Sequence, residues 1–154
     1  VESFAGNPEQ GGCQLSSSWE KAGGTAVRRD ILISASHDFL RDQAFWDAER
    51  RASGDTASFA PPCTSFSIAN TRPALRSVEA PYGDPNNPKV AMGNRFAMLT
   101  VRRALQMIAA GVHVLIQNPL MSYLWLLYEV QAMMGSVGMY LVRIDQCTVG
   151  TPYK

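Results

Sequence analysis

The sequence predicts an α/β fold in which a mostly parallel sheet carries helices on both faces. Short apolar runs of strand length alternate with segments of about ten to fifteen residues that have helical spacing. The chain has 154 residues, of which 46% are hydrophobic and 18% are charged, as in ordinary globular proteins. This length fits one domain with a real core.

Turn residues and apolar spacing divide the first half of the chain. Gly6 stops the first apolar run, Leu15 and Trp19 lie four positions apart as on one helix face, and Pro61-Pro62 end a later apolar run. These signals predict a strand over residues 1–5, a helix over 13–21, a strand that begins at 25–27 and closes near Asp30, an amphipathic helix over 39–51 and a strand over 56–60.

The second half begins with a long proline-rich loop over residues 68–93, and loops of that length are usually functional or disordered. Asn94 is a suitable N-cap for the helix that follows. Gly111 ends that helix. The pattern then predicts, in order, a helix over residues 94–110, a buried strand over 112–116, a helix over 122–134 and a strand over 139–144.

Charge is balanced overall but unevenly distributed. The net charge is +1, which excludes the overall basic excess of a compact nucleic-acid binder. Residues 1–71 carry 6 basic and 9 acidic side chains, whereas residues 72–111 carry 6 and 2. The second segment includes Arg72, Arg76 and Arg95. These arginines are either phosphate contacts or members of a solvated face.

Several classes of protein do not fit. The most apolar stretch, residues 120–134, is interrupted by Glu129 and is shorter than the ~20 residues of a membrane span, so no membrane partner is expected. Three cysteines are too few, and odd in number, for a disulfide framework, which indicates a reducing compartment. His37 and His113 are too far apart to suggest a metal pair, and His113 in its apolar run indicates a core residue. No metal is expected.

Ligands of parallel α/β sheets bind at the carboxyl ends of the strands. The residues expected there are the candidate site: Gly6, Asp30, Asp38, Pro61-Pro62-Cys63 and Gln117-Asn118-Pro119. The phosphate fingerprint GxGxxG is absent after the first strand. Asn7-Pro8-Glu9-Gln10 stand in its place, and Glu9 would repel a phosphate, so a nucleoside ligand fits better than a dinucleotide.

Two interpretations stay open for the acids of this edge. A carboxylate accepts two hydrogen bonds at once, so Asp30 and Asp38 suit ribose hydroxyl groups. Either acid could instead belong to a solvated turn, and Asp38 could simply cap the helix expected after it. Gly6 likewise serves a close approach to a ligand or a plain turn.

The most informative string is Phe59-Ala60-Pro61-Pro62-Cys63-Thr64-Ser65-Phe66-Ser67. A cysteine directly after a strand and two prolines lies on a stiff loop, where a nucleophilic thiolate would be positioned. The string resembles the Pro-Cys catalytic loop of the cytosine-5 DNA methyltransferases, which continues to Phe-Ser as Phe66-Ser67 do here.

Three further motifs similar to those of that family stand in the family's order along the chain, one before this string and two after it. Phe4-Ala5-Gly6 is similar to its first S-adenosylmethionine motif. Gln117-Asn118-Pro119 stands where the family has Glu-Asn-Val or Glu-Asn-Pro, and Gly150-Thr151-Pro152-Tyr153 resembles its Gly-Val-Pro-Gln. The resemblance covers the whole chain. It is to a divergent, methylase-like domain of phage or mobile-element type.

The resemblance implies a Rossmann-like methyltransferase fold and a division of roles. Cys63 would attack C6 of a cytosine flipped out of DNA, and C5 would take the methyl group of S-adenosylmethionine. Gln117 and Asn118 would complete the catalytic set. The cofactor would be bound by Phe4, Ala5, Gly6, Asp30, Asp38, Phe39 and Pro62, and the DNA by Arg72, Arg76 and Arg95.

The chain departs from the family at a decisive position. A carboxamide at Gln117 hydrogen-bonds a base edge but cannot act as the acid that the family's Glu provides. The alternative function is therefore an inactive methylase-like module that holds nucleic acid or cofactor within a larger polyprotein. An amino-group methyltransferase ranks last, because Ala60-Pro61-Pro62-Cys63 lacks the polar and aromatic residues of that class. Residues 1–154 are expected to be a catalytic-core fragment without a target-recognition domain.

Overall fold

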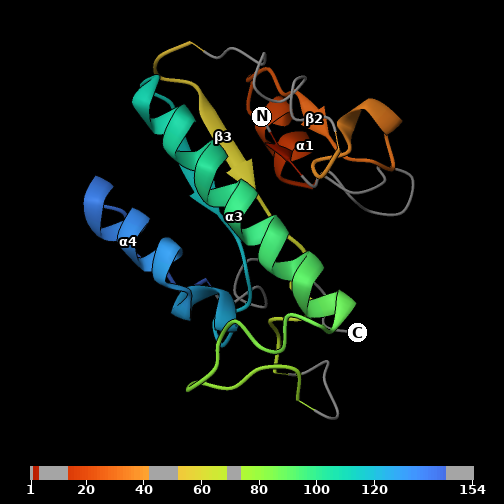
Figure 1. The fold of residues 1–154 in the computed structure, drawn as a ribbon. Helices are drawn as coiled ribbons and strands as arrows, with labels where there is room; N and C mark the ends of the chain where they lie inside the picture. Colours follow the sequence, from red (N-terminus) through yellow and green to blue (C-terminus); the bar gives the residue numbers. More distant parts are fainter. Residues whose placement is uncertain (1, 4–13, 42–51, 69–73, 145–154) are drawn as a thin grey trace.

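The computed structural model describes residues 2–3, 14–41, 52–68 and 74–144 (Figure 1). The alternation of strands and helices confirms the predicted α/β class. The elements in order are β1 (Glu2–Ser3), α1 (Gln14–Lys21), β2 (Arg28–Arg29), η2 (Ala35–His37), β3 (Thr56–Phe59), α3 (Pro88–Ala109), β4 (His113–Ile116), η3 (Tyr123–Leu126) and α4 (Tyr128–Val137), where η marks a short 3-10 helix. The strands of the described residues form one four-stranded sheet, and each neighbouring pair is parallel.

The strand order is β2-β1-β3-β4. The chain leaves β1 toward one side to form β2, then crosses back to the other side of β1 to form β3 and β4. Such a reversal is typical of doubly wound sheets, whose ligands bind beyond the carboxyl ends of the two strands at the reversal. The topology therefore directs attention to the space beyond the ends of β1 and β3.

Helices lie on both faces of the sheet. Partners in parallel strands project to the same face, so Glu2 and Arg28 point one way and Ser3 and Phe59 point the other way. Glu2 Oε2 accepts a hydrogen bond from the backbone N–H of Ser16, and Arg28 Nε donates to Ser16 Oγ, which fixes α1 on the first face. The opposite face, with Phe59, packs against α3.

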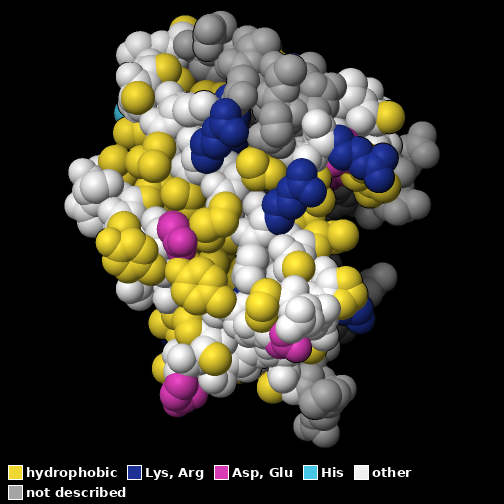
Figure 2. All heavy atoms as spheres, viewed as in Figure 1, with side chains coloured by type: hydrophobic (Ala, Val, Ile, Leu, Met, Phe, Trp, Pro, Cys, Tyr) yellow, Lys and Arg dark blue, Asp and Glu magenta, His cyan; other side chains and the backbone are white. Residues whose placement is uncertain are grey.

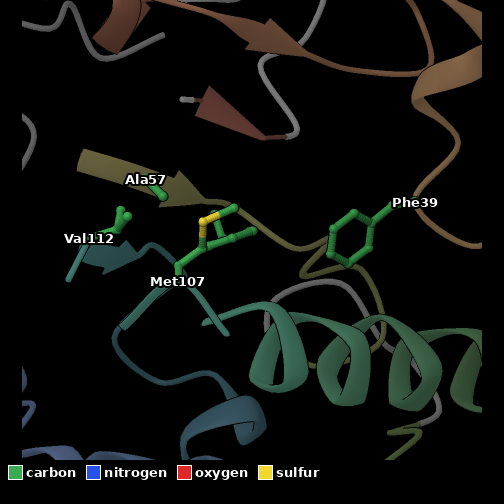
Figure 3. Close-up of a cluster of buried hydrophobic side chains, with 5 residues drawn as sticks. Phe39, Ala57, Met107 and Val112 are labelled. Atoms are coloured by element: carbon green, nitrogen blue, oxygen red, sulfur yellow. The ribbon is translucent and has the colours of Figure 1, made fainter. Parts of the chain in front are cut away.

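The main hydrophobic core lies between the sheet and α3. Its buried members are Phe39, Ala57, Phe59, Met107 and Val112. The rings of Phe39 and Phe59 pack at a tilt of 60° with centroids 6.4 Å apart. Figure 3 shows Phe39 just beyond the carboxyl end of β3. The core thus reaches the edge where the candidate site is expected.

A second core joins α3 to the C-terminal helices. Its buried members are Phe66, Ala97, Leu124, Leu127 and Val130. The helix α4 lies beside α3, on the opposite side from β3 (Figure 1), and hydrophobic side chains are exposed over this region (Figure 2). Because Phe66 follows Cys63 by three residues, this core also anchors the turn that carries the thiol.

The long helix begins earlier than the sequence predicts. It starts at Pro88, and the side chain of Asn87 accepts from the backbone N–H of Lys89 as its N-cap. Proline suits the first helical position, where its missing N–H costs nothing. Asn94, the predicted cap, lies inside the helix, where its side chain donates to the carbonyl of Tyr82. The predicted loop over residues 68–93 is therefore shorter at its C-terminal end.

Residues 112–116 are predicted to form a buried strand; the strand β4 forms, but the prediction that it is buried is wrong. Val114 and Ile116 pack on α3, but His113 and Leu115 on the opposite face are exposed. Among the described residues β4 pairs with β3 alone, and α1 lies over the β1 and β2 side of that face. His113 is therefore an exposed residue of an edge strand, and the expectation of a core histidine is wrong.

Three smaller predictions also differ. The second strand, predicted to begin at Thr25 and to close near Asp30, forms only at Arg28–Arg29, where Arg28 finds polar partners on α1. Residues 122–134 form η3 and then α4, separated by an extended Leu127 whose side chain is fully buried. Residues 139–144, predicted as a strand, have no assigned strand. The predicted helix over residues 39–51 lies for the most part outside the described residues.

Candidate functional site

The carboxyl ends of β3 and β4 bring two sequence-predicted turns together. Phe59 pairs with Ile116 at the end of these strands, and the backbone N–H of Gln117 donates to the carbonyl of Phe59 over 2.8 Å. Asn118 Nδ2 donates to the carbonyl of Pro61 over 2.9 Å. The turn with Gln117 and Asn118 is therefore fastened to the turn that leads into Cys63.

Cys63 begins a turn that is closed by backbone hydrogen bonds. The carbonyl of Cys63 accepts from the backbone N–H groups of Phe66 and Ser67 over 2.9 and 2.8 Å. Cys63 is half-buried and free of any disulfide. The residue is thus held at the sheet edge, with partial access to solvent.

The side chains of Gln117 and Asn118 differ in their surroundings. Gln117 is exposed at the edge, where its amide can meet a ligand. Asn118 Oδ1 is buried and has no hydrogen-bond partner among the residues that the structure describes. Asn118 therefore ties the two turns together through its amide nitrogen, and its oxygen keeps an unused acceptor.

A cavity of about 330 Å³ opens at the same edge. This volume falls at the lower end of the ~300–1,000 Å³ typical of ligand pockets. Its walls come from the segment after β2, the end of η2, the turn after β3 and the N-terminal half of α3. The lining residues are Arg29, Asp30, Ile31, Leu32, His37, Asp38, Phe39, Pro62 and Phe96.

The cavity gathers four residues that the resemblance assigns to the cofactor: Asp30, Asp38, Phe39 and Pro62. They come from segments up to 32 positions apart in the sequence. The other three residues of that set, Phe4, Ala5 and Gly6, lie outside the described residues.

Both acids also take part in local turns. Asp30 Oδ1 accepts from the backbone N–H of Leu32 over 2.8 Å, and Asp38 Oδ1 accepts from that of Leu40 over 2.9 Å. Asp38 Oδ2 lies 3.4 Å from Arg41 Nε. These contacts fit the turn-forming interpretation, and a carboxylate can accept more than one hydrogen bond. The two interpretations are compatible for both residues.

The structure adds residues that the sequence analysis did not single out. Phe96 on α3 and His37 on η2 line the cavity, and His37 Nδ1 lies 3.2 Å from the carbonyl oxygen of Asp30. Phe96 shares the sheet-facing stripe of α3 with Leu99 and Met107. Because α3 runs antiparallel to the strands, that spacing could have placed Phe96 near their carboxyl ends (Figure 1).

Arg76 has a different role from the predicted one. Its side chain is buried, and all five of its N–H donors are used within the protein, by Ser65 O, Ser65 Oγ, Pro81 O, Val90 O and Asn94 Oδ1. Burial lowers the pKa of Arg76 to about 10, so the guanidinium is charged at neutral pH. The prediction that Arg76 contacts DNA phosphate is therefore wrong, because no donor remains for one.

The other basic residues differ in their placement. Arg95 is exposed on α3 and donates to the carbonyl of Leu40 over 2.8 Å, close to the cavity. Figure 2 shows basic side chains over and beside α3. Arg72 lies outside the described residues. Arg95 is therefore an exposed cation, and its contact with DNA phosphate stays a prediction.

Within the described ranges, no three His, Cys, Asp or Glu side chains gather as a metal site would require. No helix in the same part of the chain is both long and apolar enough to cross a membrane.

No family model, curated protein or solved structure matches this chain. The chemistry of the site therefore has to be argued from its own residues.

Proposed function

We propose that this chain is a Rossmann-like methyltransferase domain that binds S-adenosylmethionine and methylates C5 of cytosine in DNA. The observation that carries the proposal is the hydrogen bond from Asn118 Nδ2 to the carbonyl of Pro61. It fastens the Gln117-Asn118 turn to the Cys63 turn at the ends of adjacent parallel strands. A cavity lined by Asp30, Asp38, Phe39 and Pro62 opens at that edge.

The fold alone does not select this function, because doubly wound sheets serve many chemistries. The site supports it in two ways. The cavity pairs apolar walls from Phe39, Pro62 and Phe96 with two carboxylates, which suits a base and the hydroxyl groups of a ribose. A cysteine borne on the turn that supplies Pro62 suits a thiolate working next to a bound nucleoside.

The proposed chemistry has three covalent steps. The Cys63 thiolate adds to C6 of the extruded cytosine, and the electron pair moves toward C5. C5 then takes the methyl group from the sulfonium of S-adenosylmethionine, which leaves as S-adenosylhomocysteine. Transfer of the C5 proton to solvent water finally restores the double bond and expels the thiolate. Extrusion of the base is required because C6 cannot be reached inside the duplex.

The test uses DNA in which the target cytosine carries fluorine at C5. Fluorine cannot leave as the proton does, so the adduct through Cys63 persists after methyl transfer. We expect the chain with S-adenosylmethionine to form a covalent protein–DNA adduct that survives denaturing electrophoresis. The Cys63→Ser variant should form none, and Thr64→Ser, which changes an exposed residue of the same turn, should still form it. A wild-type chain that never forms the adduct would contradict the proposal.

The second candidate is an inactive module of the same fold that binds cofactor or nucleic acid. The exposed Gln117 favours it, because an amide cannot protonate the base. This candidate expects S-adenosylmethionine to bind in the cavity while the fluorinated DNA forms no adduct. Cofactor binding and adduct formation measured on one preparation therefore separate the two functions.

A further inference from the structure

The guanidinium of Arg76 joins three parts of the chain. Nε and Nη2 donate to the carbonyl and hydroxyl oxygens of Ser65, over 2.9 and 3.0 Å. Nη1 donates to Pro81 O over 2.8 Å and to Asn94 Oδ1 over 2.7 Å, and Nη2 also donates to Val90 O over 3.2 Å. Arg76 thus links the turn after Cys63, its own loop and the first turns of α3.

The aromatic ring next to Ser65 completes this contact. The guanidinium carbon of Arg76 lies 3.9 Å from the centroid of the Phe66 ring, a cation–π distance. Phe66 is fully buried, and its carbonyl accepts from the backbone N–H of Tyr123 in η3. The turn is therefore held by Arg76 on one side and by η3 on the other.

The packing leaves no slack around this contact. A Cβ atom on Gly93 of α3 would lie 2.2 Å from Ser65 Oγ and 3.1 Å from Arg76 Nη2. The backbone of α3 at Gly93 therefore lies directly against the Arg76–Ser65 contact. A turn enclosed in this way keeps one geometry, and its first residue is Cys63, whose carbonyl accepts from Phe66 and Ser67.

A buried charged side chain with five hydrogen bonds is not required for stability alone, because hydrophobic residues packed in the same place often stabilise the fold as well or better. What such a network provides here is a fixed orientation. We propose that Arg76 is a positioning residue that fixes the Cys63 thiol by holding the turn at Ser65. The catalytic consequence rests on the function proposed above.

The test compares two variants that each remove one hydrogen bond of Arg76. Ser65→Ala deletes a bond to the Cys63 turn. Asn94→Ala deletes a bond on the helix side, together with the bond from Asn94 to the Tyr82 carbonyl. If Arg76 served stability alone, Asn94→Ala would be at least as harmful. Both variants are measured at a temperature where circular dichroism shows them fully folded.

With the fluorinated DNA, we expect Ser65→Ala to lower the maximal rate of adduct formation by about 10- to 100-fold, since small misplacements of a reacting group have effects of this size. The DNA concentration that gives half the maximal rate should stay unchanged. Asn94→Ala should trap at nearly the wild-type rate. Equal slowing by the two variants would overturn the proposal and leave the methyltransferase function standing.

A second readout needs no DNA or cofactor. In a chain with Cys13→Ser and Cys147→Ser, iodoacetamide reports the exposure of the Cys63 sulfur alone. We expect Ser65→Ala to raise the alkylation rate about fivefold, the factor that corresponds to losing one hydrogen bond, and Asn94→Ala to leave it near wild type. If the wild type traps no DNA, the methyltransferase proposal fails, and this measurement still decides the role of Arg76. Equal alkylation rates in the two variants would refute that role.

Discussion

Gln117 is the residue that decides between an active enzyme and a binding module. Its side chain is exposed at the end of β4, and its backbone is fixed by the bond to the Phe59 carbonyl. A carboxyl group at the same place could donate a proton, which an amide cannot do. The change of a single functional group therefore separates the two proposals.

We expect Gln117→Glu to raise the rate of adduct formation with fluorinated DNA, because a general acid contributes roughly 10²–10⁴-fold. The Gln131→Glu variant places the same charge on the exposed surface of α4 and is the control. The measurement is the initial rate of adduct formation at saturating S-adenosylmethionine. If Gln117→Glu traps no faster than Gln131→Glu, another group activates the base.

At the same scale, Asp30 and Asp38 can be tested as ligand-binding acids apart from their role in turns. Asp84 provides a matched control, because its Oδ1 accepts from the backbone N–H of Asn86 two residues on, as Asp30 and Asp38 do with their neighbours. An asparagine keeps one oxygen acceptor, removes the negative charge and replaces the second oxygen with an amide donor. A larger loss of ligand binding at Asp30 and Asp38 than at Asp84 then points to a role of these acids in the cavity.

We expect Asp30→Asn and Asp38→Asn to weaken S-adenosylmethionine binding by about 10- to 100-fold, the factor for losing a hydrogen bond to a charged group. Asp84→Asn should bind as the wild type does. Isothermal titration calorimetry gives the dissociation constants. Equal affinity in all three variants would return both acids to the turn-forming interpretation.

Among the secondary-structure elements, α3 does most to build the site. It supplies Phe96 to the cavity, and Arg95 reaches the Leu40 carbonyl beside it. It also supplies the partners of Arg76 and packs between the two cores. Its glycine at position 93 lies in the middle of the first three turns, where glycine normally weakens a helix.

Gly93 is required because α3 approaches Ser65 and Arg76 closely at this position. Without that contact, an alanine here would stabilise the helix. We expect Gly93→Ala to lower the free energy of unfolding by about 1–3 kcal/mol, since overpacking outweighs the gain in helix propensity. Gly135→Ala in α4 is the control: apart from the backbone of its own helix, no described residue has an atom within 4 Å of the added Cβ, so it should stabilise by about 0.5–1 kcal/mol. Urea unfolding curves measure both. A stabilised Gly93→Ala protein would contradict the packing described around Ser65.

For the whole molecule, the cavity joins segments that fold onto different parts of the sheet. Residues after β2, after η2, after β3 and on α3 must all be in place before the cavity exists. A ligand that binds only this assembled edge must stabilise the native state as a whole. Binding and global stability are therefore linked in this protein.

We expect S-adenosylmethionine or S-adenosylhomocysteine to raise the melting temperature of the chain. At a ligand concentration of 100 times the dissociation constant, the stabilisation is about 2.7 kcal/mol. Thermal unfolding followed by circular dichroism, with and without ligand, measures the shift. The absence of any shift at millimolar ligand would count against both functions that place this cofactor in the cavity.

The sequence by itself determined the α/β class, the helix after Gln14, the strand before Pro61-Pro62 and the set of turns expected at one edge. These depend on local signals: apolar periodicity, glycine and proline at boundaries, and polar residues directly after strands. The nearness of the Cys63 and Asn118 turns also followed, because parallel strands place their carboxyl ends together.

Only the tertiary structure decided the roles of Arg76, Asn94 and His113. Local pattern predicts a surface cation at Arg76, a helix cap at Asn94 and a core residue at His113, because it does not reveal what packs against each. Arg76 is buried because five acceptors from distant segments meet it, and Asn94 is one of them. His113 is exposed because β4 lies at the edge of the described sheet. Such partners are supplied by long-range contacts, and those are fixed only when the whole chain has folded.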